Sequence, residues 1–151
     1  MTIGARNSLR IEGLRGISEG LRMLVNLQEL EVKIGYTNSI LAEGAIALSE
    51  GLKYLVNLRK FSLQIGDYND ISINGATAIG TSISKMVNLE DLTISIDSEN
   101  TIGSYGATGL FNGLGYQPKL KNLKLSIDFN NYIENWSLSL LGKKLQQLQE
   151  L

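Results

Sequence analysis

Apolar residues follow two alternating patterns along the chain, and both patterns recur every 31 residues. In segments such as 30–34 every second residue is apolar, which is typical of a strand with one buried face. In segments such as 45–55 the apolar residues lie three or four apart, which predicts an amphipathic helix. The chain is therefore expected to alternate strands of about five residues with helices of about a dozen residues.

An asparagine marks the same place in every unit, two residues before a Leu or Ile. A fixed period of this length indicates stacked supersecondary units. The asparagines are Asn7, Asn38, Asn69, Asn100 and Asn131. We expect one domain, 1–151, which comprises a partial unit 1–26, the units 27–57, 58–88, 89–119 and 120–150, and the start of a further unit at Leu151.

Units of one strand and one helix that repeat in register predict an α/β solenoid. The strands are expected to form a parallel sheet on the concave side and the helices to cover the convex side, because helices are wider than the spacing of strands. A glycine near each helix start, as at Gly44 and Gly75, indicates close approach to neighbouring backbone. The last unit has Ser137 and Leu138 where the others have Gly and Ala, so it should pack differently.

The asparagine column has a structural explanation. Each asparagine follows a strand, where backbone groups stop pairing and would be buried without partners. An amide side chain supplies donors and an acceptor, so a stacked column can bond these groups from unit to unit. A row of ligand-binding amides is the functional alternative.

The amino-acid composition excludes several classes of chemistry. The sequence has no Cys and no His, which excludes disulfides, thiolate nucleophiles, Cys/His zinc sites and imidazole bases. A net charge of −1 predicts neither nucleic-acid binding nor membrane binding. Without a secretory signal, a cytoplasmic location is expected. We expect no cofactor, no metal and no catalytic residue.

The repeat resembles the leucine-rich repeat of the ribonuclease-inhibitor-like class. The matching motif is Leu-x-x-Leu-x-Leu, then Asn-x-Ile, then Gly-Ala before an amphipathic helix. Compared with that class, this repeat has three additional residues between the strand and the asparagine. These residues should build a thicker ridge beyond the strands. The resemblance implies a non-catalytic protein-binding scaffold whose concave sheet or rims contact the partner.

Two surfaces are candidates for binding a protein. The ridge after the strands is predicted to carry Tyr36, Asp67, Tyr68, Asp97, Glu99, Asp128, Phe129 and Tyr132. Alternatively, these rings fill space created by the insertion. The concave sheet is predicted to present a second set of candidates, Glu29, Glu31, Lys33, Lys60, Asp91 and Lys124. The structural alternative is that these charges pair with one another across strands. We favour the ridge, because large exposed rings are typical of interfaces.

The favoured function is a scaffold that forms part of a longer repeat array or of a larger assembly. One alternative is an architectural subunit of a large cytoskeletal or ciliary complex, and another is a carboxylate-based metal-binding or enzymatic module. Repeat arrays need polar caps at their ends. Because the ends of this chain are apolar, we expect further repeats or partner chains to cover them.

Overall fold

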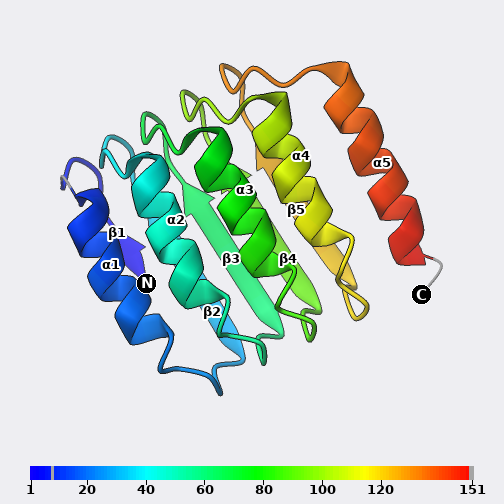
Figure 1. Ribbon diagram of the computed structural model, residues 1–151, viewed down its shortest axis with the longest axis horizontal. Helices are drawn as coiled ribbons and strands as arrows, with labels where there is room; N and C mark the ends of the chain where they lie inside the picture. Colours follow the sequence, from blue (N-terminus) through cyan, green and yellow to red (C-terminus); the bar gives the residue numbers. More distant parts are fainter. Residues whose placement is uncertain (8, 150–151) are drawn as a thin grey trace.

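Strands and helices alternate along the whole described part of the chain. The computed structural model describes residues 1–7 and 9–149 (Figure 1), so Leu151, the expected start of a further unit, lies outside the described residues. The strands are β1 (Thr2–Ile3), β2 (Glu29–Ile34), β3 (Lys60–Ile65), β4 (Asp91–Ile96) and β5 (Asn122–Ile127). The helices are α1 (Arg10–Leu21), α2 (Leu41–Leu52), α3 (Ser72–Ile83), α4 (Gly103–Leu114) and α5 (Asn135–Gln149).

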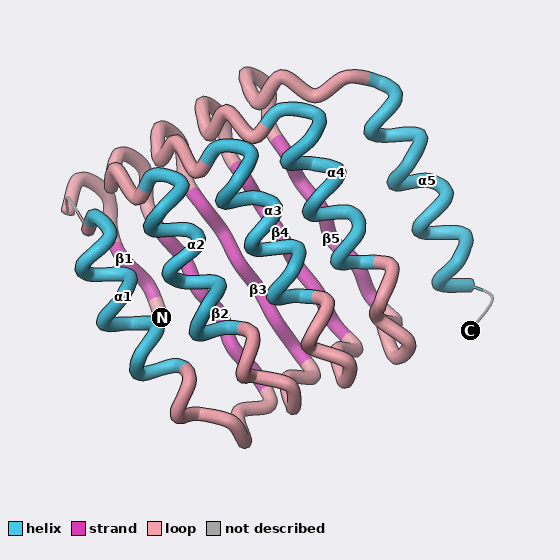
Figure 2. The backbone as a smooth tube through the Cα atoms, in the orientation of Figure 1, coloured by secondary structure: helices cyan, strands magenta, loops and turns pink. Residues whose placement is uncertain are grey.

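The five strands form one parallel sheet in the order β1-β2-β3-β4-β5. Each residue pairs with the one 31 positions later, as Leu30 does with Phe61 and Phe61 with Leu92. All the helices lie on the same face of this sheet (Figures 1 and 2). The fold is therefore an α/β arrangement of repeated strand-helix units, in which equivalent positions of successive units are neighbours.

The core lies between the sheet and the helices. Every second strand residue points into it, and Leu63, Ile94 and the helix residue Ile79 are fully buried. The intervening strand residues, such as Ser62 and Gln64, remain partly accessible on the other side, which we call the open face. The alternation expected from the sequence thus corresponds to one covered face and one accessible face.

The helices end earlier than the apolar pattern predicted. Leu55 belongs to the predicted helical face, as does Met86 at the same position of the next unit, but α2 ends at Leu52 and α3 at Ile83. Both side chains are nevertheless buried, because the chain continues in a tight turn. The N–H of Leu55 donates to Leu52 O at 3.0 Å, and the N–H of Met86 donates to Ile83 O at 2.9 Å. Bonds to the third residue back replace the helical pattern and keep the side chains directed inward.

Glycine allows the helices to pack closely. A Cβ added to Gly75 would lie 2.8 Å from Ala45 Cβ, so the helices are close at this position, but the nearest atom belongs to a side chain and not, as expected, to the backbone. A second set was not expected from the sequence: a Cβ on Gly113 would lie 2.1 Å from Gly80 O, and one on Gly80 would lie 2.2 Å from Gly109 O. The backbones of α3 and α4 are therefore in direct contact.

Helix α5 stands farther from α4 than the other helices stand from their neighbours (Figure 2). Ser137 and Leu138 replace the Gly-Ala pair at its start, and Leu138 is exposed. Farther along, Phe111 and Lys144 occupy the positions that Gly80 and Gly113 hold at the preceding interface. These larger side chains separate the backbones, so the expectation of different packing in the last unit is confirmed.

Candidate functional site

The asparagine column runs through the turns that follow the strands. Asn38, Asn69, Asn100 and Asn131 are at most 1% exposed, whereas Asn7 in the first unit is exposed. Asn69 Nδ2 donates to Gly66 O of its own unit and to Gly35 O of the preceding unit, both at 2.9 Å. Asn69 Oδ1 accepts from the Asn38 N–H at 3.0 Å. Each such amide therefore joins two turns, and its interior position argues against the row of ligand-binding amides.

The column is less completely bonded near the C-terminal end. Asn100 Nδ2 and Asn131 Nδ2 each donate to backbone carbonyls of two units. Their Oδ1 atoms, however, are buried without a hydrogen-bond partner among the described residues. The contribution of the asparagines to stability should therefore be largest in the middle of the stack.

The turns that carry the column have an unusual backbone. Residues with positive φ recur at the same places of successive turns, and most of them are not glycine. Thr37, Ser39 and Leu41 form one such set, with φ of 55°, 51° and 55°. L-residues adopt this region at an energetic cost. Bonds between units offset the cost: the N–H of Thr37 donates to Asp67 O at 2.9 Å and that of Leu41 to Asn69 O at 3.0 Å.

We call the strand-to-helix turns of residues 35–39, 66–70, 97–101 and 128–132 the ridge. Its four aromatic rings do not fill an internal space, because Tyr36, Tyr68, Phe129 and Tyr132 are 46%, 62%, 77% and 68% exposed. Just beyond the ridge, Tyr105 and Trp136 share one unit position and pack edge to face with ring centroids 5.5 Å apart. Large exposed rings in three of the four turns form the kind of surface that protein interfaces use.

The acidic residues of the ridge receive only neutral donors. Asp67 Oδ1 accepts from the Ser98 N–H at 2.9 Å, and Glu99 Oε1 accepts from Asn130 Nδ2 at 2.8 Å. No ion pair in the described part of the chain involves a ridge carboxylate. The ridge segments also contain no Lys or Arg, so their negative charge is uncompensated locally.

Asp97 combines partial burial with this negative charge. Burial raises the pKa of its carboxyl group above the ordinary range, and the nearby carboxylates of Asp67 and Asp128 raise it further, against a hydrogen bond from Ser95 that lowers it. Ionised Asp97 is therefore less favourable in the folded chain than in the unfolded chain.

We expect Asp97→Asn to stabilise the fold at pH 7. A raised folded-state pKa means that the folded chain holds this proton more tightly, so stability falls as the pH rises above the ordinary aspartate pKa of about 3.9 and through the folded value. Urea midpoints of the variant and the wild type should agree near pH 3 and diverge toward pH 7. A less stable variant at pH 7 would show that the bond from Ser95 to the carboxylate outweighs the repulsion.

Charges on the open face and at its edge are paired with one another. Glu29 and Lys60 approach to 3.0 Å across neighbouring strands, and Glu31 and Lys33 approach to 2.9 Å. At the start of the strands, side-chain hydrogen bonds from Lys121 and then Arg59 lower the pKa of Glu90. Of the remaining candidates, Asp91 accepts a hydrogen bond from Asn122. Lys124 has no ion pair within the described residues, but most of this surface is already self-compensated.

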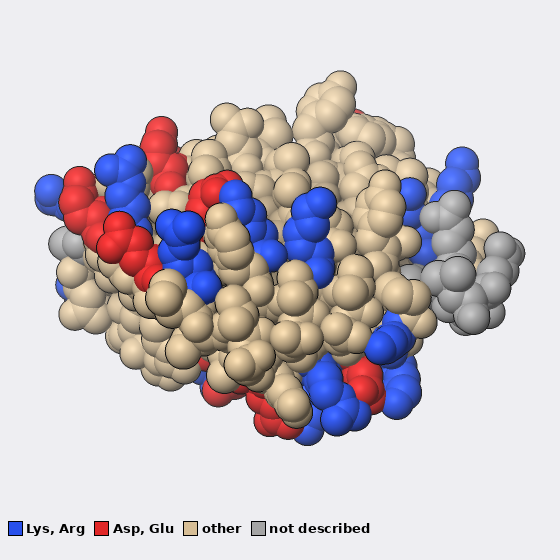
Figure 3. Space-filling model, turned by 60° about the horizontal axis from the view of Figure 1, so that its bottom comes forward, with Lys and Arg blue, Asp and Glu red and all other residues tan. Residues whose placement is uncertain are grey.

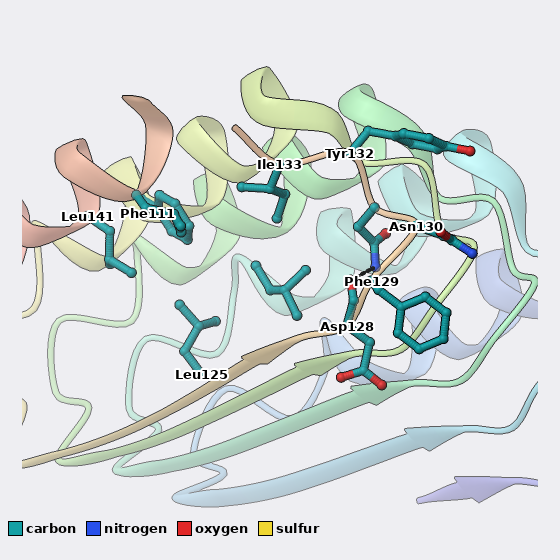
Figure 4. A pocket seen from close by; sticks show the side chains of 11 residues that line it. Phe111, Leu125, Asp128, Phe129, Asn130, Tyr132, Ile133 and Leu141 are labelled. Carbon is teal, nitrogen blue, oxygen red and sulfur yellow. Dashed lines mark hydrogen bonds between the residues drawn. The ribbon is translucent and has the colours of Figure 1, made fainter. Parts of the chain in front are cut away.

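An apolar hollow of about 530 Å³ lies beside the ridge in the last unit, under α5. Figure 4 shows Leu125, Ile133 and Leu141 gathered on one side of it, with the rings of Phe129 and Tyr132 directed away from them. The hollow exists because α5 stands away from α4. It adds an apolar recess to one end of the ridge, which the sequence did not predict.

A second feature missed by the sequence analysis lies at the opposite end of the strands. Asn57 Nδ2 donates to Val25 O at 2.9 Å, and Asn88 Nδ2 donates to Val56 O at 3.0 Å, so these turns also carry an asparagine column. The same period of 31 residues would have identified it.

Comparisons with known proteins leave the chain without an assigned family. Searches against models of protein families and against curated proteins gave no match. Within the described residues, no helix is long and apolar enough to cross a membrane, and no cluster of three or more Asp or Glu residues is arranged to hold a metal ion. Function must therefore be argued from the surfaces described above.

Proposed function

We propose that this chain is a leucine-rich repeat of the ribonuclease-inhibitor-like class and acts as a non-catalytic scaffold that binds a protein through the ridge. In this proposal the sheet is the concave side of an arc and the helices are its convex side. The regular 31-residue register of strands, turns and helices supports the assignment. The absence of His and Cys from the sequence leaves few groups for catalysis.

The contrast between the ridge and the open face is the observation that carries the proposal. The open face uses most of its charges internally, as in the Glu29–Lys60 and Glu31–Lys33 pairs. The ridge instead exposes four rings beside carboxylates that have no cationic partner in the described residues. Aromatic anchors and unpaired charge together favour a partner with a basic surface.

The proposal predicts that Tyr68→Ser combined with Phe129→Ser weakens the binding of a fluorescent peptide rich in Lys and Arg. We expect a loss of about tenfold or more in affinity, measured by fluorescence anisotropy, because exposed rings provide most of the apolar contact. Both rings are more than half exposed, so the free energy of unfolding should change by less than about 0.5 kcal/mol.

The matched control combines Lys60→Ser with Lys124→Ser on the open face. This pair should bind the peptide as the wild type does or more tightly, because it removes positive charge. Loss of binding in the open-face pair alone would overturn the ridge as the binding surface. Unfolding of the ridge pair would show that its rings are structural.

A further inference from the structure

The helix-to-strand turns of residues 22–28, 53–59, 84–90 and 115–121 form the edge opposite the ridge, which we call the basic edge. One unit position there presents an apolar row, with Val25, Val56 and Val87 each 41–46% exposed. Tyr54 and Tyr116 share another position of these turns and are also exposed. Apolar side chains are thus retained in successive units where the stack does not bury them, which is typical of a contact surface.

Cations surround this apolar row. The four segments contain six cations, which are Arg22, Lys53, Arg59, Lys85, Lys119 and Lys121, against the single carboxylate of Glu90. Arg59 and Lys121 both pair with Glu90, and Lys53 pairs with Glu50, so the uncompensated charge of this edge comes from the other three cations. Figure 3 brings this edge forward and shows Lys and Arg side chains across it, with acidic side chains mainly at the left and along the lower border. The net charge of −1 for the whole chain conceals this local excess.

The ridge has the opposite charge. Its four segments contain five carboxylates, Asp67, Asp70, Asp97, Glu99 and Asp128, and no cation. Arg6, in the equivalent turn of the first unit, lies over the Tyr36 ring at 5.4 Å. The two ends of the same strands therefore carry opposite charges, and both combine charge with exposed apolar groups.

The two surfaces also share one spacing. Ridge turns and basic-edge turns are the two ends of the same paired strands, so both repeat at the strand spacing of about 4.8 Å. A second copy placed end to end along the strand direction can therefore bring successive acidic turns opposite successive basic turns. An anionic lipid surface would match the charge of the basic edge but has no fixed spacing.

We propose that the ridge of one copy docks on the basic edge of a second copy. This inference rests on the proposed function, in which the ridge is the binding surface, and it identifies the basic partner as the chain itself. The contact joins two different surfaces and leaves one ridge and one basic edge free in each pair. Such heterologous contacts produce open chains of copies rather than closed dimers.

Sedimentation velocity at increasing protein concentration tests the proposal. The wild type should form oligomers at low salt and return toward the monomer at about 1 M salt, where the Debye length falls to about 3 Å. An edge-reversed variant carries Arg22→Glu, Lys85→Glu and Lys119→Glu. A ridge-reversed variant carries Asp70→Lys, Glu99→Lys and Asp128→Lys. Each variant alone should associate about tenfold or more weakly, because both of its surfaces then have the same sign.

An equimolar mixture of the two variants is the decisive sample. The acidic ridge of the edge-reversed chain can then meet the basic edge of the ridge-reversed chain, and the two new surfaces are complementary as well. We expect the mixture to recover oligomers that neither variant forms alone. Failure of the mixture to associate, or wild-type oligomers that are insensitive to salt, would overturn the docking of ridge on edge.

Two probes separate this inference from the function on which it rests. If the wild type stays monomeric but the ridge binds the Lys/Arg-rich peptide, self-association is wrong and the binding ridge stands. If the peptide does not bind either, both proposals fail. A third outcome is that a monomeric wild type binds phosphatidylserine vesicles but not phosphatidylcholine vesicles, with no binding by the edge-reversed variant. This result would show that the basic edge contacts lipid, and it would overturn the proposal that a second copy docks there.

Discussion

Replacement of Asn69 by alanine is expected to lower the free energy of unfolding by about 3 kcal/mol. The Asn38 N–H would lose its acceptor, and Gly35 O and Gly66 O would each lose one of the two asparagine amides that donate to them. Asn69 is fully buried, so water does not reach the groups left behind without rearrangement of the turn. The measurement is the urea midpoint, with the slope of the transition checked for constancy.

Two further substitutions test the hydrogen-bond explanation. Asn74→Ala removes an exposed asparagine from α3 and should change stability by less than about 0.5 kcal/mol. Asn69→Asp keeps the shape of the side chain but removes the donors, and it places a carboxylate beside two carbonyl oxygens. It should therefore destabilise more than Asn69→Ala at pH 7. Equal stability of Asn69→Ala and Asn74→Ala would mean that the hydrogen bonds of the column do not contribute to stability.

Gly113→Ala is expected to destabilise the protein by about 2 kcal/mol, although alanine favours helices. The added Cβ would lie 2.1 Å from Gly80 O and 2.9 Å from Gly80 Cα. The obstacle is backbone rather than a flexible side chain, so α3 and α4 must separate along their contact. Thermal and urea unfolding should both report the loss.

Gly16→Ala is the matched control, and it should change the free energy of unfolding in the opposite direction. Gly16 lies inside α1, and a Cβ there would meet no atom within 4 Å among the described residues. Gly16→Ala should therefore stabilise the protein by about 0.5–1 kcal/mol through helix propensity and reduced freedom of the unfolded chain. If Gly113→Ala also stabilised the protein, the close contact of α3 with α4 would not be required.

The period of 31 residues carried most of the information about the fold. Alternating apolar residues placed the strands, and apolar residues three and four apart placed the helices. Equivalent positions in a stacked array are neighbours, so Ser137 and Leu138 in place of Gly and Ala indicated from sequence alone that the last unit would pack differently. Helix ends were predicted less well, because Leu55 and Met86 are apolar and buried whether the chain is helical or turning.

The candidate surfaces could be located but not characterised from sequence. Tyr68 and Phe129 were assigned to the ridge, yet apolar content alone does not distinguish an exposed ring from one that fills a gap. The acidic residues of the ridge were identified from the sequence, but the cations of the basic edge were missed, because total charge sums over surfaces that lie at opposite ends of the strands. The hollow under α5 depends on the side chains of two different helices, which no single segment reveals.

The sequence by itself determined the alternation of strands and helices, their register and the buried face of each, because local periodicity encodes these features. Only the tertiary structure decided the backbone of the ridge, the spacing of the helices and the exposure of the rings. Thr37 and Leu41 adopt left-handed conformations against their intrinsic preference, since their N–H groups donate to the next unit. Such bonds exist only after the units stack, so contacts between residues distant in the chain override local propensity there.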